Sequence, residues 1–254
     1  MRFFLESLRS RNETLFYFGL LCLALALIFF ALSLISSVQV VGVNAWLKPF
    51  KFSLSIFLYS WTMAWYCHYL PSFNIKNFNW TVIILLGFEI AYIAFQASRG
   101  KMSHFNVSTP IYSFFTMLMA LGALGVTLYT AYIAILFFRF DFPELPHYYL
   151  WSIRLGLIIF VLFSLEGFVI GSKMGHTVGA PDGGKGLPVV NWSKSHGDLR
   201  IAHFIGMHAL QVLPLISFYV LRNVKATVIV GLLYFVLAVL VLIQALNGKP
   251  LFKN

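Results

Sequence analysis

Acidic residues are scarce in this chain, which has only eight Asp and Glu among 254 residues and 10% charged residues of all kinds. Soluble domains carry about a quarter charged residues, so a surface that faces water on all sides is excluded. Hydrophobic residues instead make up 60% of the sequence. The composition therefore indicates a protein that faces lipid over much of its surface.

Several motifs are missing as well. The sequence has no GxSxG serine motif, no repeated CxxC and no HExxH zinc motif, so serine-hydrolase, thiol-redox and zincin chemistry lack a signature. The two cysteines, Cys22 and Cys67, lie in apolar runs and are predicted to pack as small apolar side chains. The net charge of +10 comes from singly scattered basic residues rather than a stripe, which does not predict nucleic-acid binding.

Seven segments are long and apolar enough to cross a bilayer as helices, at about 20 residues per crossing. They are continuous apolar runs without the strict alternation of a membrane barrel. No hydrophilic run is long enough for a second domain, so we predict an all-α membrane bundle formed by residues 1–254 as a single polytopic domain in the lipid bilayer. The predicted spans are 14–36, 49–70, 80–97, 110–137, 148–171, 198–220 and 226–246.

Unusual polar strings follow the odd-numbered spans, at 44–51, 96–106 and 171–197. Loops after odd spans share one side of the membrane, so these strings are predicted to lie on the same face. Loops after even spans are short and have ordinary connector content. We therefore predict one polar site on this face, and five of the seven histidines belong to it: His104, His176, His196, His203 and His208.

The segment 197–211 is the most unusual of the apolar runs, because it carries Asp, Arg, two His and Gln. Ionisable groups at membrane depth are costly and usually face a bundle interior, a partner or a water-filled cavity. At about 100° per residue, most of these polar side chains fall on one arc of the helix. The arc contains His196, Arg200, His203, His208 and Gln211.

Local signals predict several helix boundaries. Asp198 lies off this arc, as a capping residue would, and its spacing from Ser195 resembles a capping box, which predicts that span six begins near Ser195. Thr109-Pro110 predicts the start of span four. Glycines recur every fourth residue over 167–179, which predicts close packing of the end of span five against a neighbouring helix.

The residue types of the polar site favour metal or haem chemistry, because neutral imidazole binds zinc, iron and copper. His203 and His208 are five residues apart and point about 140° apart on a helix, so they need a further ligand from another segment. The predicted ligands of a zinc, iron or haem group are His203, His208, His104 and His176. The predicted catalytic residues are Glu166 and Asp182, as acid, base or additional ligand, and Arg200, which would orient an anionic group. The predicted substrate contacts are Gln96, Arg99, Asn106 and Gln211.

Three functional classes stay open at this point. The leading hypothesis is an enzyme that acts on a lipid-soluble substrate, through a metal-activated water or a His-ligated haem. The alternative is a proton- or anion-coupled transporter or channel, although the seventh span is wholly apolar. The third is a structural or assembly subunit whose polar groups meet a partner protein. Glu89, near the middle of span three, fits a proton relay or an interhelical hydrogen bond, with Arg154 as a candidate partner.

The strings at 99–106 and 197–208 resemble strings in uncharacterised bacterial multi-pass membrane proteins, and the resemblance covers most of the chain. It implies a bacterial plasma (inner) membrane location and implies no activity. Seven-span hydrolases that bind zinc through intramembrane histidines are similar in topology. Their paired HxxxH motif is missing here, so their sites are not transferred to this chain.

Overall fold

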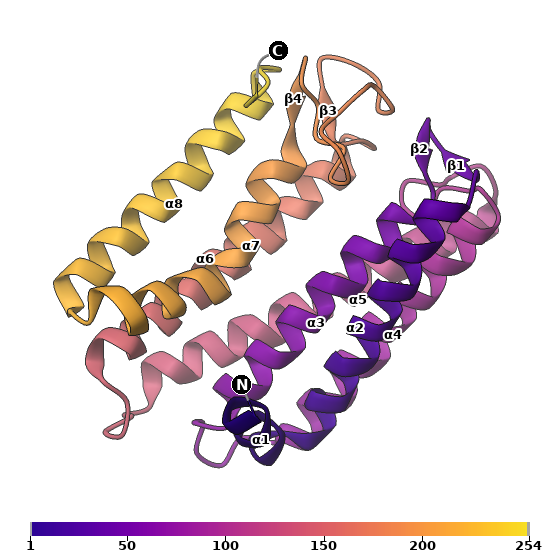
Figure 1. The fold of residues 1–254 in the computed structure, drawn as a ribbon. Coiled ribbons are helices and arrows are strands. Elements are labelled where there is room, and N and C mark those ends of the chain that lie inside the picture. The colour runs from indigo at the N-terminus through magenta and orange to yellow at the C-terminus, as the bar shows by residue number, and fades with distance from the viewer. Residues whose placement is uncertain (1, 253–254) are drawn as a thin grey trace. The chain divides into compact units, whose positions relative to one another are not determined.

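The computed structural model describes residues 2–252. Over these residues the chain forms eight α-helices and four two-residue strands, which pair into two antiparallel two-stranded sheets (Figure 1). A π-helical segment, Ser217–Leu221, directly continues α7. The elements are α1 (Arg2–Arg11), α2 (Glu13–Ile35), β1 (Gln39–Val40), β2 (Val43–Asn44), α3 (Leu47–Cys67), α4 (Ile75–Ser98), α5 (Pro110–Arg139), α6 (His147–Ser172), β3 (Thr177–Val178), β4 (Gly197–Asp198), α7 (Leu199–Ile216) and α8 (Val224–Leu246).

The helices confirm the predicted membrane bundle. Every predicted span is helical within about five residues of its predicted ends. Six helices are long and apolar enough to cross a membrane: α2, α4, α5, α6, α7 with its π-helical continuation, and α8. The helix of the predicted second span, α3, is not among them, because Lys48, Lys51 and several serines make it less apolar.

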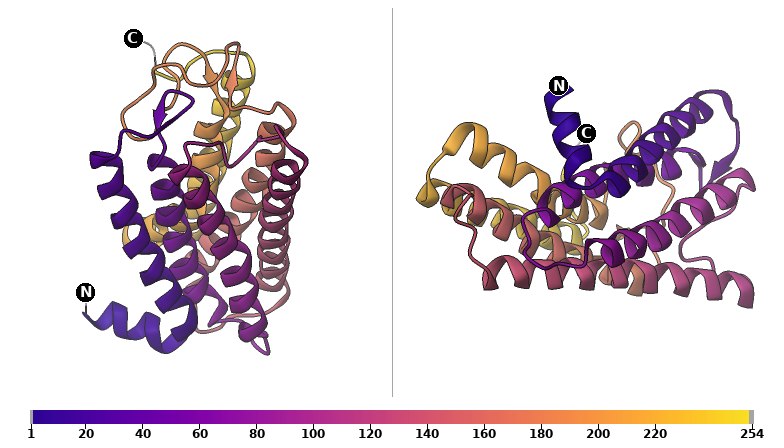
Figure 2. Two further views of the ribbon diagram at one scale, coloured as in Figure 1. Left: turned by 90° about the vertical axis from the view of Figure 1, so that its right-hand side faces the viewer. Right: turned by 90° about the horizontal axis from the view of Figure 1, so that it is seen from below.

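The first helix, α1, was not predicted. It is short and turns away from the axis of α2 (Figure 2). Its apolar side packs inward, since Leu8 is fully buried and the Phe4 ring stacks on Trp65 at 5.6 Å. The guanidinium of Arg11 lies 3.7 Å from the centre of the same indole ring. This pattern of one apolar and one basic face is typical of a helix that lies at a membrane interface.

The chain packs as two compact units, Met1–Val126 and Thr127–Asn254, and the boundary falls inside α5. We call them unit 1 and unit 2. In unit 1, α3 packs along α2 and α4. In unit 2, α6, α7 and α8 pack against one another. The single polytopic domain stays a prediction.

In unit 2, α6 and α7 approach each other closely at glycines. A Cβ on Gly206 of α7 would overlap the Phe163 side chain of α6, and a Cβ on Gly156 of α6 would come within 2.9 Å of the Ala209 carbonyl oxygen. The core around this crossing consists of Ile159, Phe163, Ile201, Ala202, Ala209, Leu213, Ala238 and Val241.

The predicted packing role of the glycine repeat over 167–179 is wrong beyond its first member. Helix α6 ends at Ser172, so Gly175 and Gly179 lie in the following loop. A Cβ on Gly171 would have no neighbour within 4 Å. The close crossing of α6 and α7 instead depends on Gly156 and Gly206, which lie outside this repeat.

Within each unit, loops that follow odd-numbered spans lie together, as predicted. In unit 1, the loop after α4 meets the hairpin after α2, because a Cβ on Gly100 would lie 3.4 Å from Val38. In unit 2, the loop after α6 meets the end of α8, because a Cβ on Gly248 would lie 3.4 Å from the Val178 carbonyl oxygen.

Candidate functional site

Two predicted site residues from different helices, Glu166 and His203, are in contact in unit 2. Glu166 lies in the last two turns of α6 and His203 near the start of α7, so the close crossing of these helices brings them together. Oε2 of Glu166 lies 3.1 Å from Nδ1 of His203. The carboxyl side chain is only 4% exposed, whereas the imidazole is 30% exposed. Gly167 leaves room for the ring, since a Cβ at this position would lie 3.2 Å from Cε1 of His203.

This contact assigns different roles to the atoms of the pair. Beside an ionised Glu166 carboxylate, which can only accept, Nδ1–H of His203 is the donor to Oε2 and Nε2 keeps its lone pair. The other carboxyl oxygen, Oε1, is buried and has no hydrogen-bond partner among the described residues. An unsatisfied buried acceptor costs about 1–3 kcal/mol, so this atom is the natural place for a proton or a donor group to bind.

His208 does not join this pair. Its Nδ1 lies 2.8 Å from the Phe204 carbonyl oxygen, one turn back on the same helix. Its ring lies over that of Phe204, with the centroids 4.0 Å apart. The Phe204 ring in turn meets Trp192 from the preceding loop, with the centroids 5.4 Å apart.

Asp198 and Arg200 organise the start of α7. Asp198 is 1% exposed, and its carboxylate accepts hydrogen bonds from the backbone N–H groups of Ser193 and Arg200. The Arg200 guanidinium binds both carboxylate oxygens, at 2.9 and 2.6 Å, and also donates to the Asn191 carbonyl oxygen at 2.6 Å. The guanidinium predicted to orient an anionic substrate thus holds the loop before α7.

Asp198 is the N-cap of α7, as its position off the polar arc predicted. The predicted helix start near Ser195 is wrong, because α7 begins at Leu199. The preceding residues Gly197–Asp198 form β4 and pair with β3. Strand pairing therefore outcompetes the capping-box register at this position.

His176 and Asp182 form a second pair in the loop between α6 and α7. Nδ1 of His176 lies 2.8 Å from Oδ1 of Asp182, which also accepts the backbone N–H of Thr177 at 2.9 Å. Burial acts to raise the pKa of Asp182, but the hydrogen bonds from His176 and Thr177 hold this pKa well below its ordinary value. Burial lowers the pKa of His176, and the Arg200 charge acts in the same direction. Both shifts favour a neutral imidazole beside an ionised carboxylate.

The remaining site candidates are divided between the two units. Unit 1 contains Gln96, Arg99, His104 and Asn106, and unit 2 contains Gln211, which lies half-buried on α7. Gln96 is fully buried, and its amide donates to the Tyr92 hydroxyl at 2.8 Å. Asn106 binds its own loop, where its side chain contacts the Met102 carbonyl and Ser108.

Arg99 is exposed on unit 1, whereas His104 is half-buried. The Arg99 guanidinium lies 5.2 Å from the centre of the Phe95 ring. The His104 ring packs beside Phe52, and its Nδ1 lies 3.2 Å from the Ser103 hydroxyl. Among the residues that the structure describes, no group of three or more His, Cys, Asp or Glu side chains is placed to hold a metal ion.

Glu89 of unit 1 and Arg154 of unit 2, which were candidate partners, each interact with other groups in their own unit. Arg154 donates to the Phe137 carbonyl oxygen at 2.8 Å and lies against the rings of Phe138 and Trp151. The cation that acts electrostatically on Glu89 is Lys48 of α3. Sequence reasoning missed Lys48 in this place because it is 41 positions away along the chain. Gly167 was predicted to allow close approach of a neighbouring helix, and it lies against the His203 ring of α7.

Comparison with models of protein families, with curated proteins and with solved structures finds no match for this chain.

Proposed function

We propose that this protein is a membrane-embedded enzyme that transfers a proton to or from a lipid-soluble substrate at the Glu166–His203 pair. One observation carries the proposal. A buried carboxyl group binds the imidazole through one oxygen, and its other oxygen has no partner among the described residues. A carboxylate that fixes the tautomer of a histidine is a common arrangement for general acid–base catalysis.

The division of roles follows from the atoms. Nε2 of His203 accepts a proton from an acidic O–H or C–H group of the substrate, which leaves the substrate as an anion. The Glu166 carboxylate stabilises the resulting imidazolium through Nδ1–H, and the proton then returns to the substrate at the same or another atom. The free Oε1 of Glu166 is available to accept a hydrogen bond from a substrate hydroxyl group. The substrate is expected to be lipid-soluble, because His203 lies in a membrane-spanning helix beside Phe204, which is 43% exposed.

Metal or haem ligation by His203 is the second candidate function, and a separate observation favours it. Histidines that bind metals usually donate their other N–H group to a carboxylate or a backbone carbonyl oxygen. His203 and His208 both have Nδ1 beside such an oxygen, Glu166 Oε2 and the Phe204 carbonyl respectively. A complete ligand set does not converge among the described residues, so we derive no reaction step through a metal.

Deuterium transfer tests the proton-transfer function across many candidate lipid substrates at once. The purified protein is incubated with a total membrane-lipid extract in D2O, and deuterium at carbon positions of the lipids is measured by mass spectrometry. We expect incorporation by the wild-type protein and a loss of about 10²-fold or more in H203Q and E166Q, the scale of general acid–base catalysis.

Matched controls are available in the same unit. His147 and Glu144 lie exposed near the start of α6, so H147Q and E144Q make the same chemical changes away from the pair. Incorporation that is equal in H203Q, E166Q and the wild type would refute proton transfer at this pair. Metal analysis and a visible spectrum of the same preparation test the second candidate, which requires a metal or haem that is present in the wild type and lost in H203Q.

A further inference from the structure

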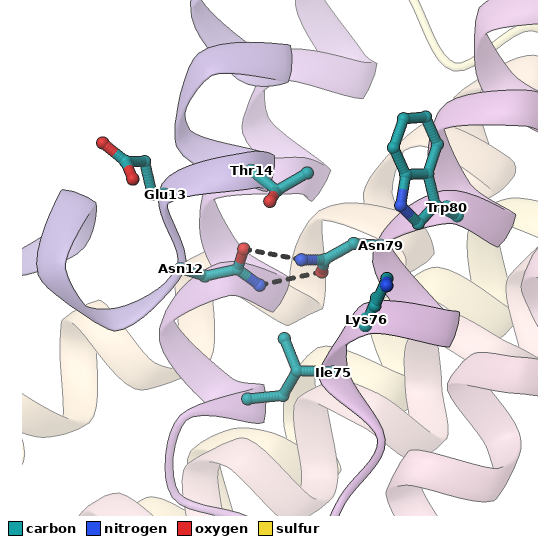
Figure 3. Close-up of a pocket in the computed structure, with 7 residues that line it drawn as sticks. All are labelled: Asn12, Glu13, Thr14, Ile75, Lys76, Asn79 and Trp80. Atoms are coloured by element: carbon teal, nitrogen blue, oxygen red, sulfur yellow. Dashed lines mark hydrogen bonds between the residues drawn. The ribbon is translucent and has the colours of Figure 1, made fainter.

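The beginnings of α2 and α4 in unit 1 are joined by a buried pair of amides. Each of Asn12 and Asn79 donates its side-chain N–H to the side-chain oxygen of the other, at 2.9 Å in both directions (Figure 3). The two residues are 5% and 4% exposed. This reciprocal pair fixes the start of α2 against the second turn of α4.

A cavity of about 340 Å³ lies at this junction (Figure 3). We call it the polar cavity, because most of its lining residues are polar or charged. Glu13 borders it, but its carboxylate is bound by the Arg9 guanidinium at 2.8 Å. Among the described residues, Lys76 is thus the lining side chain whose charge has no counter-ion. The cavity is lined by Asn12, Glu13, Thr14, Ile75, Lys76, Asn79 and Trp80. The positive charge of Lys76 therefore makes this cavity suited to an anionic group of a ligand.

A second cavity, of about 300 Å³, follows the same two helices further into the membrane-spanning region. It opens to the surface, because Leu21 and Ala91 on its border are exposed. One of its walls is made of small residues of α4, and a Cβ on Gly87 would be no closer than 4.0 Å to Phe18. The lining is apolar throughout and consists of Phe18, Leu21, Cys22, Leu25, Phe29, Gly87, Ile90, Ala91 and Ala94.

The dimensions of the apolar cavity fit one leaflet of a bilayer. From Phe18 to Phe29, α2 rises about 16 Å at about 1.5 Å per residue, and half of a bilayer core is about 15 Å thick. Tyr17 and Trp80, which are 48% and 52% exposed, lie within the first two turns of α2 and α4. Aromatic residues at this depth mark the membrane–water interface. The polar cavity therefore lies at headgroup level and the apolar cavity at acyl-chain level.

We propose that α2 and α4 form a binding site for one anionic phospholipid. Its phosphate contacts the Lys76 ammonium and the Thr14 hydroxyl in the polar cavity, and one acyl chain lies in the apolar cavity against Gly87, Ala91 and Ala94. A phospholipid fits because it combines an anionic group and a leaflet-length chain at the observed spacing. The proposal concerns unit 1 and is independent of the proton-transfer function of unit 2.

Native mass spectrometry of the full chain in mild detergent tests this site. Phosphatidylglycerol and phosphatidylcholine with identical acyl chains are added separately, and occupancy of the one-to-one adduct is measured. We expect a preference of about fivefold for phosphatidylglycerol, the scale of one lysine near an anionic headgroup. K76E should abolish this preference and K76R should keep it.

The control for the charge is Lys225, which is exposed and is the second residue of α8, as Lys76 is of α4. Both helices also begin after an Asn that caps them. K225E should therefore keep the headgroup preference. An equal loss in K76E and K225E would show a general charge effect and overturn the proposal.

The apolar cavity is tested by A91W, which fills it, against A120W on the exposed surface of α5. We expect A91W to lower binding of both lipids about tenfold and A120W to leave it unchanged. The smaller substitution A91L replaces A91W if circular dichroism shows loss of helix. Unchanged lipid occupancy in folded A91W or A91L would overturn the placement of the acyl chain.

Discussion

Gly167 of α6 lies directly against the imidazole of His203 in α7, so that a Cβ at residue 167 would come within 3.2 Å of the ring carbon Cε1. This distance is tighter than ordinary van der Waals contact, and the ring must shift by a few tenths of an ångström to accept a methyl group. The hydrogen bond from the ring to Glu166 depends on the same position.

We therefore expect G167A to lower deuterium incorporation into lipids about threefold to tenfold, because small displacements of catalytic groups are costly. The protein should still fold, as judged by circular dichroism and gel filtration. The matched control is G171A, since a Cβ on Gly171 meets nothing within 4 Å. The same reduction in both variants would argue against a role for the ring position.

Asp198→Ala should destabilise unit 2 by about 3–5 kcal/mol, because it leaves the partly buried Arg200 guanidinium without its counter-ion. It also removes the N-cap of α7. Thermal unfolding in detergent, followed by circular dichroism, measures the change. Asp141→Asn, an exposed site in the loop before α6, should change stability by less than about 0.5 kcal/mol.

The loop between α6 and α7 should open as the pH falls below about 6.5, the ordinary pKa of histidine. Burial lowers the pKa of His176 in the folded loop, so the unfolded loop binds a proton first and folding loses stability as the pH falls. The pKa of Asp182 is also lowered, so a second loss should follow below about pH 3.9.

Hydrogen exchange of residues 173–198 between pH 7.5 and 5 measures the first of these losses, after correction for the intrinsic pH dependence of exchange. H176Q should remove the pH dependence in this window. A dependence of equal size in H176Q would assign the titration to another group.

Gly206→Ala should cost about 1–3 kcal/mol, the usual range for overpacking, because its Cβ would overlap the Phe163 side chain. Gly171→Ala should be neutral or stabilising by up to about 1 kcal/mol, since alanine has the higher helix propensity. Thermal unfolding of both variants gives the difference. Equal stability of G206A and the wild type would contradict the close crossing of α6 and α7.

The apolar spans could be predicted because each is a local property of about 20 residues, and the seven predicted segments are all helical in the structure. Thr109-Pro110 likewise predicted the start of α5, which begins at Pro110 with the Thr109 hydroxyl accepting from the Tyr112 N–H. The start of α7 was wrong because β3 comes from a distant part of the loop, and its pairing with β4 is not a local property.

The side-chain partners were harder to predict than the helices. Glu166 and His203 were both candidates from their own sequence positions, but a 37-residue separation hides their contact. Arg200 was predicted to bind or pair with an anionic group, but the sequence did not show that its guanidinium binds the Asp198 carboxylate and the Asn191 carbonyl. A sequence gives the type of an ionisable side chain and its approximate depth in the membrane. It does not give the residue that forms a hydrogen bond or an ion pair with that side chain.

The apolar runs of the sequence are enough to establish a helical membrane protein and the approximate positions of its long helices, because lipid requires long apolar segments whose backbone groups are satisfied within each helix. Which polar groups meet depends on how the helices pack. The crossing of α6 and α7 at Gly156 and Gly206 brings Glu166 to His203, and the Asn12–Asn79 amide pair sets the beginning of α2 beside α4. Such contacts depend on close approach between segments far apart in the chain, and no local pattern records that approach.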